Sequence, residues 1–502
     1  MEQLLAALLA IFQPENLLLL VGGSIIGVVF GMIPGLQNVT ALSILLPFTF
    51  AMAPTQAFIL MVAIYNAGVF GGSITAILYN IPGAPENAAT TFDGHPLALK
   101  GRAAEALGTA IACSALGGLF STFVLIFAAP QIAPIALKFG PPEYFGLIFF
   151  TLCVIALMTD AVLKSVVSAL LGLLFATVGL SGITGQPRFT FGSEHLLGGF
   201  DFVVLVVGVF AVAEVFSRAE RELKGNAAVV ETAKLAARFP RLRDFFEMKG
   251  TIVRSSLLGT FVGILPALGA AAAAFMAYSM EKKLSKTPEK FGTGILRGVA
   301  APETANNASV GGALIPLLTL GIPGSSSTAV MLGAFLVFGL QPGEALFRNQ
   351  GDLVAMIYVA MLLTNAMILV LGVISIPWCA RFMKTPFPYL GPVIIVLCAI
   401  GAYTVRSNIA DVWSMFAFGV FGYVLNRYGF SVPIFVMAFI LGDIGESAFL
   451  RSMLLFDNDF SQFFSRPISG TLMGLSILVI CWVMAMHAIR FWRRSRASTL
   501  LK

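Results

Sequence analysis

Apolar segments long enough to cross a membrane recur along the whole chain. A crossing helix needs about 20 consecutive apolar residues. In the first half, the candidate segments are residues 56–80, 104–128, 142–160, 161–180 and 200–217. In the second half, they are residues 352–376, 388–405, 409–426, 431–450 and 469–490. A further apolar stretch, 308–340, is interrupted by Ile322-Pro323-Gly324, which predicts one discontinuous crossing.

The balance of apolar and charged residues excludes a soluble fold. Hydrophobic residues make up 58% of the chain and charged residues only 11%, whereas soluble domains carry roughly 25% charged residues. A soluble protein of this length needs a charged exterior, so the surplus apolar surface must face lipid. The sequence therefore predicts an all-α polytopic membrane protein.

Two further apolar stretches contain helix-breaking residues. Residues 17–52 are interrupted by Pro34-Gly35, and residues 252–280 by Pro266. Proline removes a backbone donor and clashes with the preceding turn, so neither stretch forms one straight helix. Each half of a stretch is too short to span the bilayer, and non-helical backbone survives at membrane depth only inside protein or beside a polar cavity. We therefore expect two re-entrant helical hairpins.

Basic residues predict the orientation. The segment 218–251 and the tail 491–502 are rich in Lys and Arg, so both are expected in the cytoplasm. Basic residues flank the second broken stretch on both sides, whereas the first has only Glu2 and Glu15 before it. The two hairpins are therefore expected to open to opposite sides. About 11–12 transmembrane helices result.

The two halves share motifs at identical spacing. Asn66-Ala67-x-Val69-x-Gly71 continues to Ile81-Pro82-Gly83, and Asn307-Ala308-x-Val310-x-Gly312 continues to Ile322-Pro323-Gly324. Upstream, Gly27-x-x-x-Gly31-x-x-Pro34 matches Gly259-x-x-x-Gly263-x-x-Pro266. Together with the charge pattern, this predicts an inverted repeat: residues 1–217 form the first membrane repeat, 218–251 a cytoplasmic linker and 252–490 the second repeat. Paired Gly/Pro-interrupted segments in two such halves indicate a transporter binding site near the bilayer midplane.

The helix breaks supply the chemistry of this site. A new helix N-terminus exposes N–H groups that favour a carboxylate, and hydroxyl and amide side chains follow two of the breaks. The predicted substrate-binding residues are Pro34, Gly35, Gln37, Asn38, Thr40, Pro82, Gly83, Pro266, Gly324, Ser325, Ser326, Ser327 and Thr328. Exposed carbonyls and amide oxygens suit a small coupling cation, for which the candidates are Asn66, Asn80, Asn306 and Asn307.

Several of these residues have a structural alternative. Ser and Thr in membrane helices bond to their own backbone or join helices, and a buried Asn does the latter. Glu303 and Glu86 lie close to the repeated motifs, where each could cap a half-helix, bind a cation or face the cytoplasm. Asp443 and Glu446 lie between apolar runs, which makes them functional candidates or residues at the membrane surface.

The motifs resemble those of a known family. They are Gly31-Met32-Ile33-Pro34-Gly35 through Leu46-Pro47-Phe48-Thr49-Phe50, Tyr65 through Ile74, Asn80 through Gly83, Thr91-Phe92-Asp93-Gly94-His95-Pro96, Ala301-Pro302-Glu303 with Asn306-Asn307, and Leu320 through Gly324. Together they are similar to the large membrane subunit of the tripartite tricarboxylate transporters, the TctA family.

The resemblance implies a subunit of a bacterial inner-membrane importer. Such a subunit works with a small membrane subunit of about four helices and with a periplasmic substrate-binding protein. It carries small carboxylates, citrate-like tricarboxylates among them, and is driven by a sodium or proton gradient instead of ATP. No cofactor is expected.

Three alternatives remain open at this point. An intramembrane protease would need a histidine at depth near a serine, but the histidines are His95, His195 and His487, in polar connections or beside the basic tail. An anion channel would show flux that only equilibrates. A purely structural subunit would tolerate alanine throughout Ser325–Thr328.

Overall fold

The computed structural model describes residues 2–33, 36–136, 138–157, 161–181, 185–223, 238–266, 269–382 and 387–499. Within these ranges the chain is helical apart from two two-residue strands. Strands β1 (Gly179–Leu180) and β2 (Pro187–Arg188) pair antiparallel, with Gly179 opposite Arg188. The fold class expected from the sequence, an all-α membrane protein, is confirmed at this level.

The chain forms two compact units. Unit 1 comprises Met1–Ala136 and Asp201–Arg427, and unit 2 comprises Leu137–Phe200 and Tyr428–Lys502. Each unit contains segments from both halves of the sequence, so the two units do not coincide with the two predicted repeats. The division into repeats stays a prediction.

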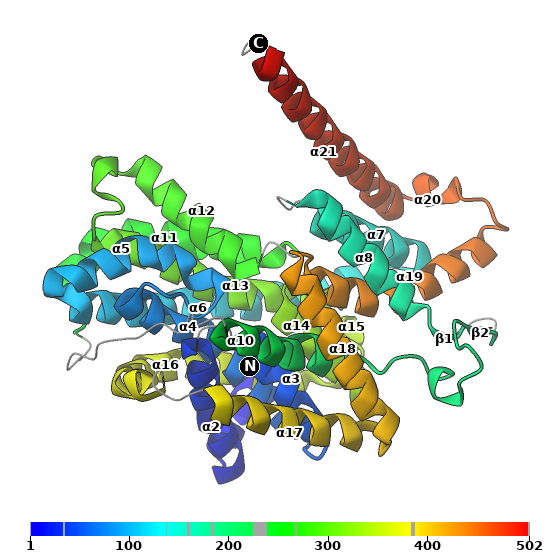
Figure 1. Cartoon of the computed structure of the whole chain (residues 1–502), viewed down its shortest axis with the longest axis horizontal. Coiled ribbons are helices and arrows are strands. Elements are labelled where there is room, and N and C mark those ends of the chain that lie inside the picture. Colours follow the sequence, from blue (N-terminus) through cyan, green and yellow to red (C-terminus); the bar gives the residue numbers. More distant parts are fainter. Residues whose placement is uncertain are drawn as a thin grey trace. The chain divides into compact units, whose positions relative to one another are not determined.

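Unit 1 contains most of the helices (Figure 1). Its first part contains α1 (Glu2–Ile11), α2 (Pro14–Met32), α3 (Asn38–Thr49), α4 (Pro54–Tyr79), η1 (Pro85–Asn87), α5 (Ala88–Leu97), η2 (Ala98–Arg102) and α6 (Ala103–Ala136). The continuous run α9 (Phe202–Val206), η4 (Val207–Val212) and α10 (Ala213–Leu223) follows. Its remaining elements are α11 (Leu242–Ile264), α12 (Gly269–Leu284), η5 (Pro288–Lys290), α13 (Leu296–Leu320), α14 (Ser326–Val337), α15 (Glu344–Asn349), α16 (Gly351–Phe382), α17 (Phe387–Arg406) and α18 (Ile409–Arg427).

Unit 2 is built around α7, α8 and α19. Its elements are α7 (Pro141–Leu157), α8 (Val162–Ala176), β1, β2, η3 (Glu194–Leu196), α19 (Val432–Leu455), α20 (Gln462–Ser465) and α21 (Pro467–Thr499). Gly172 of α8 lies against the backbone of Phe435, which brings α8 and α19 close together. Glu446 of α19 forms an ion pair with Arg188 on β2, and both side chains are partly exposed.

Eight helices within the described residues are long and apolar enough to span a membrane. They are Pro14–Met32, Pro54–Tyr79, Pro85–Pro134, Phe202–Leu223, Gly351–Cys379, Ile409–Arg427, Val432–Leu455 and Pro467–Ala485. Of the ranges expected from the sequence, 142–160, 161–180 and 388–405 form shorter apolar helices. In the run 161–180 the helix ends at Ala176, and Gly179, with a φ of 118°, begins strand β1.

Both broken stretches form a helix, a break and a second helix. In the first, α2 ends at Met32 and α3 begins at Asn38; in the second, α11 ends at Ile264 and α12 begins at Gly269. Pro34 and Gly35 lie outside the described residues, as do residues 267–268 and the linker residues 224–237. The breaks therefore fall where the prolines and glycines predict them.

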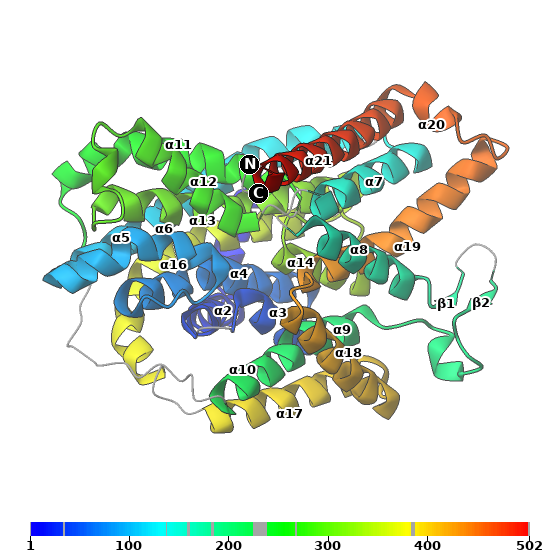
Figure 2. The same ribbon diagram turned by 45° about the horizontal axis from the view of Figure 1, so that its top comes forward.

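Equivalent glycines pack the first helix of each pair against a longer helix. A Cβ on Gly27 or Gly31 of α2 would overlap the backbone of α4 at Ile64 and Gly68. A Cβ on Gly259 or Gly263 of α11 would overlap the backbone of α13 at Ala305 and Ser309. Small residues let membrane helices approach this closely. Figures 1 and 2 show α11, α12 and α13 side by side.

The start of α13 is held by a carboxylate from another helix. Asp93 of α5 is fully buried, and its oxygens accept hydrogen bonds from the backbone N–H groups of Gly292, Gly294 and Ile295 at 2.7–3.1 Å. The Tyr278 hydroxyl of α12 donates a further bond at 2.9 Å. These N–H groups belong to the loop that leads into α13 and ends at Ile295, so Asp93 holds the start of α13 in place from another helix.

A buried carboxylate also joins the two arms of the second broken pair. Glu281 of α12 accepts hydrogen bonds from the Thr251 hydroxyl at 2.6 Å and from Arg254 at 2.7 Å, both on α11. We expect Glu281→Ala to lower the free energy of unfolding by about 1–3 kcal/mol, the cost of leaving the donors unpaired. Thermal unfolding in detergent measures this. The control is Glu247→Ala, which removes an exposed ion pair with Arg243 and should change stability by less than about 1 kcal/mol. Equal losses in the two variants would contradict the assignment.

Candidate functional site at two helix breaks

The first interruption in a long helix follows α4. Asn80 ends α4 in the left-handed conformation, with a φ of 56°. The Ile81 N–H then donates to the Thr75 carbonyl at 3.4 Å, and the Gly83 N–H to the Gly72 carbonyl at 3.3 Å. The bond from Ile81 reaches back one residue further along α4 than the bond of a Schellman helix end. The chain restarts as η1 and α5.

The second interruption, after α13, repeats this geometry. Gly321 ends α13 with a φ of 68°, and the Ile322 N–H donates to the Pro316 carbonyl at 3.2 Å. Gly321, Ile322 and Pro316 are the counterparts of Asn80, Ile81 and Thr75. Their separation in the sequence is the same as that between Asn307 and Asn66. The two breaks therefore share backbone conformation as well as sequence.

Each break holds a glycine against the neighbouring broken pair. A Cβ on Gly83 would overlap the Gly31 carbonyl oxygen of α2 and lie 2.5 Å from the Gly72 Cα. A Cβ on Gly324 would lie 2.8 Å from the Gly263 carbonyl oxygen of α11 and 2.9 Å from the Ala313 Cα. Backbone atoms cannot move aside as a flexible side chain can. The turn at Gly83 therefore packs tightly on α2, and the turn at Gly324 packs tightly on α11.

Two of the four hydroxyls after Gly324 cap the new helix α14. The Ser325 N–H donates to the Thr328 hydroxyl at 2.8 Å, and the Thr328 N–H donates to the Ser325 hydroxyl at 3.3 Å, which is a capping box. The Ser325 hydroxyl also lies 3.0 Å from the Tyr65 hydroxyl of α4. The structural alternative raised for these hydroxyls therefore applies to Ser325 and Thr328. Ser326 is half-buried and Ser327 is buried in the first turn of α14.

The other predicted substrate residues are placed as follows. Gln37 precedes α3, and Asn38 and Thr40 are buried in its first turn. The Asn38 side-chain oxygen accepts the Val39 N–H at 2.9 Å, so it too caps its own helix. The remaining described residues are Pro82 (half-buried), Gly83 and Gly324 (buried) and Pro266 (half-buried, in the turn after α11).

Buried amide side chains meet where α4, α13 and α16 cross. The Asn307 side chain donates to the Asn66 backbone carbonyl at 3.4 Å. The side chains of Asn66 and Asn365 both donate to the Met361 carbonyl, at 3.4 and 2.8 Å. The side-chain oxygens of all three asparagines are buried without a hydrogen-bond partner in the described part of the chain. A buried polar atom left unpaired costs about 1–3 kcal/mol, so each of these three oxygens is a candidate ligand for a cation.

The four asparagines named from the sequence do not all belong to this cluster. Asn306, next to Asn307, is fully buried and both its side-chain polar atoms lack partners among the described residues. Asn80 is exposed and lies fourteen residues from Asn66 along α4, which is about 20 Å at the helical rise. Asn365 was missed, because a single amide in the apolar helix α16 stands outside every repeated motif.

Glu303 is fully buried in a cage of hydroxyls. The Ser73 hydroxyl of α4 lies 2.7 Å from both carboxyl oxygens. The Ser114 hydroxyl of α6 donates at 2.8 Å, and the Thr90 hydroxyl of α5 donates as well. Among the alternatives raised from the sequence, exposure to the cytoplasm is excluded.

The energetics of this carboxyl group are balanced. Hydrogen bonds to a charged group contribute about 1.5–3 kcal/mol each, so three hydroxyl donors supply roughly 5–9 kcal/mol. Removing an unpaired carboxylate from water costs several kcal/mol, and no salt bridge to Glu303 occurs among the described residues. The two quantities are similar, so neither protonation state is strongly excluded.

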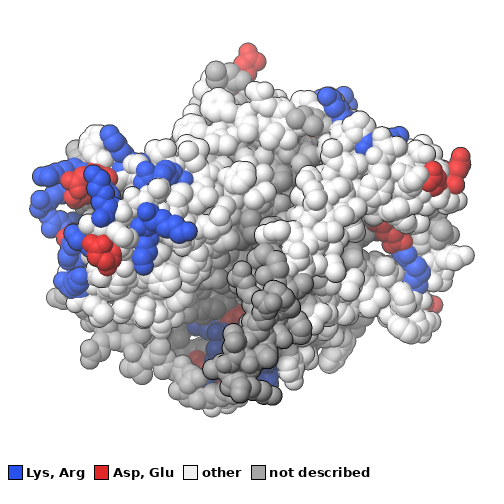
Figure 3. All heavy atoms as spheres, turned by 90° about the horizontal axis from the view of Figure 1, so that it is seen from above, with Lys and Arg blue, Asp and Glu red and all other residues white. Residues whose placement is uncertain are grey.

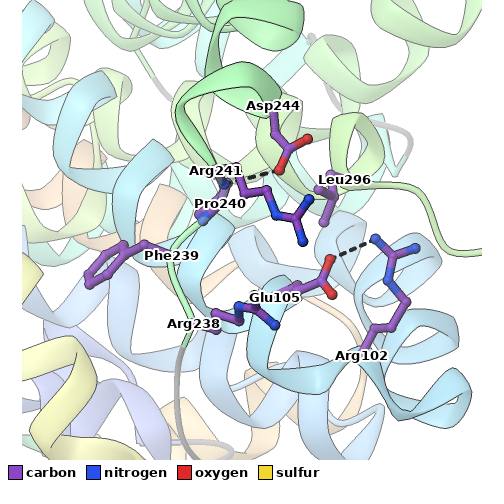
Figure 4. Close-up of a pocket in the computed structure, with 8 residues that line it drawn as sticks. All are labelled: Arg102, Glu105, Arg238, Phe239, Pro240, Arg241, Asp244 and Leu296. Carbon is purple, nitrogen blue, oxygen red and sulfur yellow. Dashed lines mark hydrogen bonds and ion pairs between the residues drawn. The ribbon is translucent and has the colours of Figure 1, made fainter.

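A separate pocket of about 280 Å³ lies where α6 meets the segment before α11 (Figure 4). Figure 4 shows Arg102 turned toward Glu105 and Asp244 toward the backbone of Arg241, at 2.7 and 3.0 Å. The Arg238 N–H donates to the Ala104 carbonyl at 2.8 Å. Both acids are already engaged, and no residue of either helix break lines the pocket. The pocket therefore lies where the end of the basic linker packs against α6.

Basic side chains gather on one side of the molecule. Figure 3 shows a patch of Lys and Arg on the side where Figure 1 places α5, α11 and α12. Exposed basic residues on these helices and the adjoining loops are Lys100, Arg243, Lys282, Lys283 and Lys290. A one-sided basic patch is typical of the cytoplasmic end of a membrane protein.

Fold and site together define a multi-pass membrane protein with unpaired polar groups buried beside two interrupted helices. The chain belongs to the tripartite tricarboxylate transporter TctA family, whose model matches residues 17–437. It is therefore a membrane transporter subunit of tricarboxylate transport and not an enzyme, as expected from its motifs.

Two relatives come from Agrobacterium vitis. The chain is 38% identical over 480 residues, 95% of each chain, to an uncharacterised 52.8 kDa protein in the TAR-I ttuC′ 3′ region. It is 36% identical over 228 residues, 45% of this chain and 93% of the relative, to an uncharacterised protein in the TAR-II ttuC′ 3′ region. No solved structure matches.

Proposed function

We propose that the chain is the permease of a cation-driven importer of small carboxylates. It works in the bacterial inner membrane with a small membrane subunit of about four helices and a periplasmic binding protein. The observation that carries this proposal is the repeated break geometry after Asn80 and Gly321, next to unpaired amides at membrane depth. Broken helices with this arrangement bind substrate and coupling ion in secondary transporters.

The substrate carboxylates bind at the helix N-termini that follow the breaks. Backbone N–H groups and the hydroxyls of Ser325, Ser326 and Ser327 supply donors at α14, and Gln37 and Asn38 supply amides at α3. Asn306 adds an unpaired buried amide that can donate to an anion. Membership of a tricarboxylate transporter family fits a site made of donors.

The coupling cation binds the side-chain oxygens of Asn66, Asn307 and Asn365. These ligands are neutral, whereas divalent cations are typically held by carboxylates. A monovalent cation such as sodium therefore fits them better. This proposed set differs from the one named from the sequence, because it adds Asn365 and leaves out Asn80 and Asn306.

The two halves are proposed to be related by an approximate two-fold axis, as an inverted repeat with two re-entrant hairpins. A contact between equivalent residues supports this: the Asn307 side chain bonds to Asn66, its counterpart. Only residues close to a two-fold axis touch their own equivalents. The glycine contacts of α2 with α4 and of α11 with α13 are equivalent as well.

The linker 218–251, the loop at Arg102 and the tail 491–502 are proposed to face the cytoplasm. Arg238 lies beside Arg102 in the pocket of Figure 4, which supports a common side for the linker and that loop. The hairpins and breaks then move as one body against the remaining helices to carry substrate across.

Uptake of labelled carboxylates into proteoliposomes tests the proposal. The vesicles contain this chain, its small membrane partner and the cognate binding protein, with or without an inward sodium gradient. Accumulation above equilibrium that needs both the gradient and the binding protein is expected. Flux that only equilibrates, with no need for either, would show a channel and overturn the proposal.

The cation ligands are tested by single substitutions. Asn66→Ala, Asn307→Ala and Asn365→Ala should each raise the sodium concentration for half-maximal uptake by about tenfold, since a lost cation ligand is worth at least about 1.4 kcal/mol. Asn349→Ala is the matched control, because Asn349 is exposed at the end of α15. Unchanged sodium dependence in all three variants, with normal expression, would remove the cluster from the mechanism.

A further inference from the structure

Glu303 lies at the meeting point of four helices in unit 1. Its carboxyl group is on α13, and the hydroxyls around it come from α4 (Ser73), α5 (Thr90) and α6 (Ser114). α5 is the half-helix that restarts after the break at Gly83. Any change at this carboxyl group therefore acts directly on the contact between α5 and α13.

Three basic groups on the surrounding elements bond to other partners, and Lys249, Lys282 and Lys283 are exposed. The His95 ring on α5 bonds to the Ile77 carbonyl, Arg297 on α13 to the Glu247 carbonyl, and Arg254 on α11 to Glu281. The other titratable groups on α4, η1, α5, α6, α11 and α12 are Tyr65, Tyr79, Glu86, Asp93, Glu105, Cys113, Arg243, Asp244, Glu247, Lys249, Tyr278, Glu281, Lys282 and Lys283. None of them forms a salt bridge with Glu303.

The chemistry of the cage separates Glu303 from Asp93, the other fully buried carboxyl group in this region. Asp93 is held by three backbone N–H groups, which can only donate, and by the Tyr278 hydroxyl. The partners of Glu303 are hydroxyls, which both donate and accept. When Glu303 is ionised, three hydroxyls donate to it. When it is protonated, one hydroxyl turns and accepts a hydrogen bond from its O–H group.

The carboxyl group is also close to the amide cluster. Glu303 and Asn307 are four residues apart on α13, so they share one helix face one turn apart. Ser73 and Asn66 are seven residues apart on α4, again on one face. A proton on Glu303 and a cation at the asparagines therefore act on the same two helices.

We propose that Glu303 is a proton-binding site that is loaded and unloaded during the transport cycle. The carboxylate takes a proton from a hydronium ion of the solvent: one O–H bond of hydronium breaks, the O–H bond of the neutral acid forms, and water is left. The neutral acid reverses one hydrogen bond in the cage, which alters the contact of α5 and α4 with α13. This inference rests on the proposed function, to which it adds a proton-linked step.

Infrared difference spectroscopy of the purified chain in lipid tests the site without transport. Titration from about pH 5 to 9 should show the carbonyl stretch of a protonated carboxyl group that disappears as pH rises. Glu303→Gln should remove this band. The control, Glu289→Gln, should keep it, because Glu289 is exposed in a loop.

A milder variant tests the cage itself. Ser114→Ala removes one donor to the ionised form, so the titration midpoint should move to higher pH by about one unit, a tenfold change in proton affinity. A Glu303-dependent band that is absent at every pH, or present at every pH, would overturn the proposal. So would a midpoint unchanged in Ser114→Ala.

Uptake measurements separate this inference from the proposed function. In proteoliposomes, Glu303→Gln should lose the pH dependence of uptake that the wild type shows, while Glu289→Gln keeps it. A normal infrared titration without any gradient-dependent uptake would sink the proposed function and leave the proton site standing. Gradient-dependent uptake with the same pH dependence in wild type and Glu303→Gln would sink the proton-linked step alone.

Discussion

Asp93→Ala is expected to lower the free energy of unfolding by about 3–5 kcal/mol, the largest loss of stability among the changes considered. The substitution leaves three backbone N–H groups without partners in a buried place, and each unpaired donor costs about 1–3 kcal/mol. It also frees the loop that begins α13, on which Glu303 and Asn307 stand. Thermal or denaturant unfolding of the detergent-solubilised protein measures the change.

Tyr278→Phe provides a graded control for Asp93→Ala. It removes one of the hydrogen bonds to Asp93 and keeps the ring that packs against Phe291. A loss of about 1 kcal/mol is expected from this variant. If Asp93→Ala were no less stable than Tyr278→Phe, the bonds from the backbone N–H groups to Asp93 would contribute nothing to stability. The role of Asp93 in holding the start of α13 would then be disproved.

Gly83→Ala should reduce uptake by tenfold or more. Its Cβ would overlap the Gly31 carbonyl oxygen and press on Gly72, so the turn must shift. Overpacking of this kind costs about 1–3 kcal/mol, and a factor of ten in rate corresponds to about 1.4 kcal/mol. Gly324→Ala should act in the same way but less strongly, because its nearest backbone atom lies at 2.8 Å.

Gly22→Ala is the control for both glycine variants. Gly22 lies on α2, and nothing is within 4 Å of the Cβ it would gain. Alanine also favours the helix more than glycine does, so expression and uptake should be unchanged or improved. Full uptake in Gly83→Ala would mean that the turn tolerates displacement and that the first break lies outside the transport path.

Local chemistry explains which features were predicted from the sequence. The helix breaks follow from proline and glycine, whose effect on the backbone acts over a few residues. Asn80 and Gly321 therefore end their helices at equivalent positions in the two halves. The shortness of α8 was missed, because the apolar run continues to residue 180 while the helix ends at Ala176.

The site depends on contacts between distant parts of the sequence, so only part of it was predicted. Ser73, Thr90 and Ser114 are each about 190–230 residues away from Glu303. No periodicity or motif shows that their hydroxyls meet. Asn365 was missed for the same reason, and Asn80 was included because spacing alone does not show where a helix end is exposed.

Unit 2 combines helices from the first half of the sequence with helices from its end, and this has a consequence for biosynthesis. Ser168 and Gly172 of α8 pack against Ser431 and Phe435 at the start of α19, and the chain between the two helices is about 250 residues long. At about 5–20 residues per second, α8 leaves the ribosome about 10–50 seconds before the helix that completes its packing. The same order holds for α18, which is made long after its partners in the run α9–η4–α10. Both groups of helices therefore stay incomplete until most of the chain has been made.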